Sequence, residues 1–179
     1  MVEEIIAKYY ADNEALRNVL LTHSRSVAEM AVALAQRHPE YHLDETFVWE
    51  AAMLHDVGIF LTDAPRIFCR GKEPYIRHGY LGAELLRSEG MPRHARVAER
   101  HTGTGLTEQS IRAQSLPLPL QDFCPETLEE QLICYADKFY SKTRLDYVKT
   151  FDEALASLRK FGDDALAPMF VWRDMFGVS

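Results

Sequence analysis

Six side chains that can bind a metal ion fall at the ends of expected helices or on their apolar faces. They are His23, His55, Asp56, His78, His101 and Asp137. Imidazole nitrogens and carboxylate oxygens together make a ligand set that suits iron, manganese or zinc. A carboxylate such as Asp56, which follows the apolar run "AAML", is stable in a protein interior only when positive charge pairs with it. The pattern therefore predicts a cluster of metal ions that neutralises Asp56 and Asp137.

Each of these residues also has a simpler explanation when it is taken singly. His23 lies on a helical stripe of core residues, and for this residue alone the favoured interpretation is a hydrogen-bonded core histidine. The other three histidines have polar neighbours and are expected at the surface; they are His38, His42 and His94. The metal hypothesis depends on the whole set and not on any one member.

The elements that must position this set read as helices. Apolar residues recur at spacings of three and four, and no segment alternates with a period of two. Expected helices cover about 2–11, 13–37, 44–56, 77–88, 92–101, 126–142, 152–160 and 164–176. Gly58 is expected to stop the third helix in a left-handed conformation, and 61–79 is expected to be a loop. These features predict an all-α, single-domain bundle of seven or eight helices.

Composition narrows the functional class. The chain has 179 residues and a net charge of −7, which argues against a broad nucleic-acid-binding face. No apolar run approaches the roughly 20 residues that a membrane span needs. The acidic, amphipathic N-terminus is atypical of a signal peptide. Three scattered cysteines are expected to be reduced thiols, which favours a cytoplasmic protein.

Positive charge is concentrated in one segment. Residues 59–100 hold eight Lys and Arg against five Asp and Glu, whereas the remainder of the chain carries −10. This local excess predicts a small anionic ligand, with Arg66, Arg70, Lys72 and Arg77 as candidate phosphate contacts. Thr102, in the sequence "TGTG", and Lys138, beside Asp137, are further candidates. The alternatives are solvated loop charges and a simple glycine-bearing helix end.

Three motifs resemble those of the HD-domain superfamily of metal-dependent phosphohydrolases. They are "LLTHSRSVAEMA", "AAMLHDVGIF" and "ICYADKFY", and together they cover about residues 20–140. Two more, "YIRHGYLGAELL" and "AERHTGTGL", resemble the additional histidine motifs of the binuclear branch, which includes bacterial hydrolases that split diadenosine tetraphosphate symmetrically. The resemblance implies one HD-type domain over 1–179, with its core at about 20–140 and C-terminal helices at 150–176.

The resemblance also implies a division of the ligands. His23, His55, Asp56 and Asp137 would hold one divalent ion, while His78, His101 and the other oxygen of Asp56 would hold a second. Asp56 and Asp137 would then be the catalytic residues, with Asp137 orienting the attacking water. Iron or manganese is favoured, while zinc, magnesium, cobalt and nickel remain open.

The implied activity is hydrolysis of a phosphate ester or anhydride bond in a small nucleotide or related phosphometabolite, with no long nucleic acid and no membrane as partner. The motif "HTGTG" differs from the "HTTG" of the binuclear hydrolases, so the substrate stays open, as does homo-oligomerisation. Two other activities compete with hydrolysis. One is a non-catalytic regulatory module that binds metal or nucleotide, and the other is a di-iron oxygenase of the same superfamily.

Overall fold

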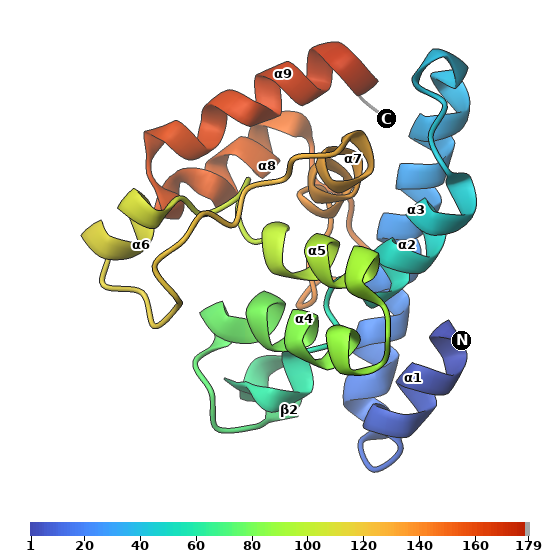
Figure 1. The fold of residues 1–179 in the computed structure, drawn as a ribbon, viewed down its shortest axis with the longest axis vertical. Helices are drawn as coiled ribbons and strands as arrows, with labels where there is room; N and C mark the ends of the chain where they lie inside the picture. Colours follow the sequence, from blue (N-terminus) through green and yellow to red (C-terminus); the bar gives the residue numbers. More distant parts are fainter. Residues whose placement is uncertain (178–179) are drawn as a thin grey trace.

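The protein is built almost entirely of helices, as the computed structural model of residues 1–177 shows (Figure 1). Within these residues there are nine α-helices: α1 (Val2–Tyr10), α2 (Glu14–Arg37), α3 (Glu45–Leu54), α4 (His78–Ser88), α5 (Pro92–Arg100), α6 (Glu108–Ala113), α7 (Leu128–Asp137), α8 (Phe151–Leu158) and α9 (Ala167–Phe176). The prediction of an all-α fold is confirmed. Within the described residues, no helix is both long enough and apolar enough to cross a membrane.

The longest helix, α2, packs against α3 and α7. Its start is fixed by Asn13, whose side-chain oxygen accepts a hydrogen bond of 3.0 Å from the backbone N–H of Leu16. The apolar stripe on one face is buried, and His23 lies on that face with 2% of its surface exposed. Helical periodicity therefore carries this histidine into the interior.

Helix α7 lies inside the bundle. It contacts α2, α3, α5 and α9, and residues 132–136 are all buried. Thr127 and Glu130 form a reciprocal capping box that fixes the start of the helix. Figure 1 shows α7 nearly end-on between α5 and α9, with α9 passing across one end of the molecule. Because α7 is enclosed on several sides, Asp137 at its C-terminal end is held in the interior.

Gly58 does not take the left-handed conformation that the sequence predicts. Its φ of −83° and ψ of −3° are open to any residue. The requirement for glycine is instead spatial, because a Cβ atom here would collide with the carbonyl oxygen of His78 and lie 2.8 Å from the Cα atom of Gly82. The chain after α3 thus approaches the first turn of α4 closely, and this contact fixes the position of His78.

The other differences from the predicted elements concern short segments. Helix α6 was not predicted, since its six residues contain only one buried side chain, Ile111, and too few turns for a periodic signal. Helix α7 ends at Asp137 and not at Lys142, because the chain continues in turns from Lys138 onward. The segment 61–79 contains a two-stranded antiparallel sheet, in which β1 (Asp63–Ala64) pairs with β2 (Cys69–Arg70).

Candidate metal centre

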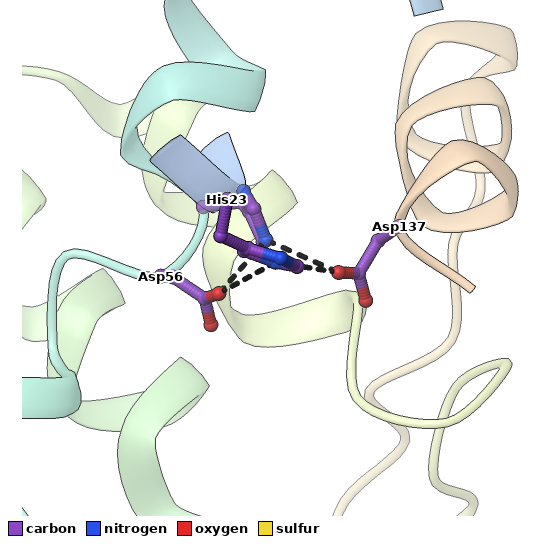
Figure 2. A group of neighbouring side chains, drawn as sticks. His23, Asp56 and Asp137 are labelled. Atoms are coloured by element: carbon purple, nitrogen blue, oxygen red, sulfur yellow. Dashed lines mark hydrogen bonds and ion pairs between the residues drawn. The ribbon is translucent and has the colours of Figure 1, made fainter. Parts of the chain in front are cut away.

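Five helices bring the six candidate metal ligands together. His23 lies within α2, the His55–Asp56 pair follows α3, and His78 is the first residue of α4. His101 follows α5, and Asp137 is the last residue of α7. Figure 2 shows the side chains of His23, Asp56 and Asp137 pointing toward one another from three different elements. All six residues are buried, with at most 9% of their surface exposed.

The first group of ligand atoms comprises His23, His55, Asp56 and Asp137. Nε2 of His23 lies 3.0 Å from Oδ1 of Asp137 and 3.2 Å from Oδ2 of Asp56. Nε2 of His55 lies 3.1 Å from the same Asp56 oxygen. The four ligand atoms all lie within 4.8 Å of one another. This is a compact set of two imidazoles and two carboxylates around one centre.

The second group comprises Asp56, His78 and His101, and it uses the other oxygen of Asp56. Oδ1 of Asp56 lies 3.3 Å from Nε2 of His78 and 3.3 Å from Nε2 of His101. The two histidine nitrogens are 3.0 Å apart. Asp56 is therefore shared, with one oxygen facing each group.

Backbone carbonyls fix the orientation of three of the rings. Nδ1 of His55, His78 and His101 donates in each case to the carbonyl three residues earlier, at 2.6, 2.7 and 2.7 Å respectively. A carbonyl can only accept a hydrogen bond, so Nδ1 carries the proton and Nε2 of a neutral ring presents a lone pair to the centre. Such hydrogen bonds to the ring nitrogen that does not bind metal are usual for metal-binding histidines.

The arrangement fits a metal in two respects. In the neutral rings of His78 and His101, two lone pairs face each other at 3.0 Å, and a shared cation removes that repulsion. Among residues 1–177, Oδ1 of Asp56 and Nε2 of His55 are buried and lack a hydrogen bond of good geometry, while Oδ2 of Asp56 has an ion pair with Lys142 but no such hydrogen bond. Buried polar atoms without partners are costly, and metal coordination would satisfy them.

The protonation of the cluster differs between its two sides. Burial lowers the pKa of His55, but the carboxylates of Asp56 and Asp137 together outweigh burial and raise that pKa to about 9. Burial lowers the pKa of His78 to about 3 and also lowers the pKa of His101. Burial alone would raise the pKa of Asp56, yet His55 and Lys142 hold it well below its usual range. The second group therefore presents neutral imidazoles beside an ionised carboxylate, which is the form that binds a divalent ion.

Two lysines complete the charge balance. Nζ of Lys138 lies 2.7 Å from Oδ2 of Asp137, and Nζ of Lys142 lies 2.6 Å from Oδ2 of Asp56. Lys142 was not singled out in the sequence, where its neighbours Ser141 and Thr143 are typical of an exposed turn. Only the three-dimensional course of the chain after α7 returns this ammonium group to the centre.

A cavity of about 650 Å³ opens from this centre. His78, His101 and Asp137 lie in its wall, together with three of the residues predicted to bind substrate: Arg66, Thr102 and Lys138. The other three predicted contacts, Arg70, Lys72 and Arg77, do not line it. The guanidinium of Arg77 pairs with Glu73 and lies 5.9 Å from the ring centre of Tyr80.

The basic segment 59–100 does not converge on the cavity as its charge suggested. Most of its arginines pair with carboxylates that lie outside the cavity: Arg87 with Glu99, Arg93 with Asp44, Arg96 with Glu130 and Arg100 with Glu126. The cavity instead receives three lysines from the C-terminal part of the chain: Lys142, Lys149 and Lys160. The sequence carries no periodic signal for these, because they lie on turns and helix ends.

The histidines expected at the surface lie away from the centre. His42 is exposed, and His38 is half-buried with its ring 2.9 Å from a carboxylate oxygen of Glu40. His94 is more enclosed than its charged neighbours suggested. Its side chain is 11% exposed and packs with a ring-centre separation of 5.0 Å against Phe47.

Comparison with known proteins gives a family and a small set of relatives. The family model described as HD domain matches residues 20–141, a span that contains all six candidate ligands. An uncharacterised protein of Methanocaldococcus jannaschii is 34% identical over 143 residues, which cover 76% of this chain and 77% of that protein.

Two longer relatives carry the name tRNA (cytidine(56)-2'-O)-methyltransferase. The one from Picrophilus torridus is 33% identical over 138 residues and the one from Thermoplasma volcanium is 33% identical over 139 residues. The matches cover 76% and 77% of this chain, but only 36% and 35% of the two methyltransferases, so the chain spans about a third of their length. No solved structure matches the chain significantly.

Proposed function

The chain belongs to the HD domain family, and from that membership we propose that it is a metal-dependent phosphohydrolase acting on a small nucleotide or related phosphometabolite. The bond cleaved is a phosphate ester or anhydride, with the oxygen of water added to phosphorus and the leaving oxygen released. The observation that carries the proposal is the complete set of six ligands in two groups that share Asp56, at the wall of a cavity rich in cationic side chains.

We propose that two divalent ions bind, one to each ligand group. When bound, such ions stabilise charge on phosphoryl oxygens and make water a stronger nucleophile. The donor set favours iron or manganese, since imidazole and carboxylate ligands occur together in sites for these metals.

The residues of the chain itself would position the reactants. Asp137 lies at the boundary between the cluster and the cavity, and its Oδ1 atom would orient the attacking water and accept its proton. The ammonium of Lys138 is held by the backbone carbonyl of His101 at 2.8 Å, and it would stabilise negative charge on the phosphate. Thr102, whose side chain lines the same wall, would donate to a phosphoryl oxygen.

We propose a small substrate and no long nucleic acid. A nucleic-acid polymer requires cationic contacts to many phosphates along a surface. In the described part of this chain most arginines of 59–100 are paired with carboxylates, whereas Arg66, Lys149 and Lys160 line one cavity without such a partner.

The names of two relatives suggest methyl transfer to tRNA as a competing activity. Because the chain spans about a third of those proteins, their names do not by themselves assign methyl transfer to it. Incubation of this chain with a tRNA transcript and a radiolabelled sulfonium methyl donor tests the alternative. Labelled tRNA would contradict the proposal of a hydrolase.

The direct test is a phosphatase screen with a panel of nucleotides. The protein is stripped of metal, reloaded with manganese or ferrous iron, and assayed for phosphate release in the absence of dioxygen. We expect metal-dependent release that is lost in Asp56→Asn. A protein that retains two ions but hydrolyses nothing on the panel would be a binding module, and a requirement for dioxygen would identify an oxygenase.

A further inference from the structure

Five cationic side chains line the cavity that opens from the metal centre. They are Arg66, Lys138, Lys142, Lys149 and Lys160. The innermost two, Lys138 and Lys142, pair with the carboxylates of Asp137 and Asp56. Among residues 1–177, no carboxylate lies within ion-pair distance of the other three. Positive charge thus remains available away from the metal ligands.

Lys149 is held in place without a counter-charge. It is half-buried, and its ammonium donates to the backbone carbonyls of Lys138 at 3.1 Å and of Tyr140 at 3.2 Å. These two bonds use two of its three N–H groups. Burial lowers the pKa of Lys149 most; the Asp137 carboxylate opposes this shift, and the charges of Lys138, Lys142 and Lys160 add to it. Several like charges gathered in one cavity are stabilised by an anion between them.

The solvent exposure of the five cationic side chains increases with distance from the metal centre. Lys138 is buried, Lys142 and Lys149 are half-buried, and Lys160 and Arg66 are exposed. The series therefore runs from the metal centre to the mouth of the cavity. A volume of about 650 Å³ falls in the range of sites for complete small-molecule ligands and exceeds the needs of a single phosphate group.

We propose that Arg66, Lys149 and Lys160 form a second anion subsite, which binds a phosphate group of the substrate other than the one at the metal centre. The substrate is then a molecule with phosphates in series, of the nucleoside-polyphosphate class, and not a simple monoester. This inference rests on the proposed hydrolytic function. The same wall also contains the side chains of Ile76, Leu158 and Phe161, which offer an apolar surface for a base.

The test compares two inorganic probes on the full chain loaded with manganese and freed of excess metal. Diimidotriphosphate is a hydrolysis-resistant chain of three phosphates, and orthophosphate has one. Isothermal titration calorimetry at fixed ionic strength should give at least tenfold tighter binding of the longer probe to the wild type. In the double variant Lys149→Ala/Lys160→Ala this preference should fall to less than threefold.

The matched control is the double variant Arg70→Ala/Lys72→Ala, which removes the same charge from the neighbouring loop outside the cavity. It should retain the full preference for diimidotriphosphate. An equal loss in both double variants would attribute binding to general charge and overturn the subsite. An unchanged preference for diimidotriphosphate in Lys149→Ala/Lys160→Ala would also overturn it. The same holds if the wild type shows no preference between the inorganic probes but binds a tRNA transcript tightly, and Lys149→Ala/Lys160→Ala abolishes the binding of that transcript.

A second assay separates this inference from the proposed function. Lys149→Ala/Lys160→Ala should lower kcat/KM for a nucleoside triphosphate at least tenfold, but should lower it less than threefold for p-nitrophenyl phosphate, which has one phosphate group. An equal fall in kcat/KM for both substrates would place the two lysines at the reacting phosphate and overturn the second subsite. If neither protein hydrolyses p-nitrophenyl phosphate or any nucleotide, the proposed function fails, while the calorimetric ratio still decides whether the subsite exists.

Discussion

The ammonium of Lys142 lies 2.6 Å from Oδ2 of Asp56, the residue that both groups of candidate metal ligands share. Its side chain is 14% exposed and the carboxylate is fully buried. The chain thus supplies a cation of its own beside the oxygen that the first metal ion would bind. Binding of a metal ion to this oxygen would require the ammonium to move toward the cavity that it also lines.

Replacement of Lys142 by Ala should therefore destabilise the metal-free protein more than the metal-loaded one. Removal of one partner of a buried ion pair costs about 3–5 kcal/mol, because the remaining charge is left without compensation. Thermal unfolding should show a lower Tm for the metal-free variant and a larger rise in Tm on addition of manganese than in the wild type. The control is Lys72→Ala, which removes an exposed lysine. If manganese raised the Tm of Lys142→Ala and of Lys72→Ala by the same amount, the proposal that metal displaces the Lys142 ammonium would be refuted.

Replacement of Asp56 by Asn should remove both metal ions and abolish hydrolysis. One oxygen of Asp56 faces each ligand group, so neutralising this side chain weakens both sites at once. After loading with manganese, the metal content measured by elemental analysis should fall from near two ions per chain in the wild type to well below one in Asp56→Asn. His38 and His42 lie outside the centre, so His38→Ala and His42→Ala should retain wild-type metal content. Wild-type turnover in Asp56→Asn would refute the assignment of Asp56 as the shared ligand.

His78→Ala and His101→Ala should each lower the metal content from two ions to one. These residues belong to the second group alone, whereas His23, His55 and Asp137 belong to the first. The ion that remains should be retained through dialysis, because its four ligands are intact. A wild-type ratio near one that neither substitution changes would show a mononuclear site.

Gly58→Ala should disturb the second metal group through the backbone. The added Cβ would collide with the carbonyl oxygen of His78, and relief of that overlap must shift the start of α4. We expect a loss of about 3 kcal/mol in the free energy of unfolding, at the upper end for overpacking, and a metal content near one. Gly90→Ala is the control, because a Cβ atom added at Gly90 has open space around it. Since Gly90 has φ of +76°, this variant should lose stability through backbone strain alone and retain both ions.

The three cysteines should differ in reactivity toward Ellman's reagent at pH 8. Burial raises the pKa of Cys69 to about 11 and that of Cys134 to about 12, and both side chains are fully buried. A thiol reacts as its thiolate, which forms only as the pH approaches the pKa. One thiol, the partly exposed Cys124, should react in the native protein and three in guanidinium chloride. Rapid reaction of all three without denaturant would contradict the packing around Cys69 and Cys134.

The sequence predicted the all-α fold and the starts of α2 and α3 because local physics determines them, whereas the HD family was predicted from the resemblance of its motifs. A helix shows its buried face as apolar residues three and four apart, and Asn13 and Asp44 satisfy backbone N–H groups within the next turn. The six candidate ligands were also identified from the sequence, because together these histidines and aspartates, at helix ends and on apolar faces, form a set that suits metal binding.

What only the tertiary structure decided is which charges face the site. Arg77 and Lys142 each adjoin a polar turn in the sequence, yet Arg77 pairs with Glu73 outside the cavity, whereas Lys142 reaches Asp56 inside it. Gly58 likewise gave no local sign that it is needed for contact with α4. Long charged side chains have no periodic requirement, and their partners are set by segments distant in the chain. Their roles therefore depend on packing, which no local pattern of residues records.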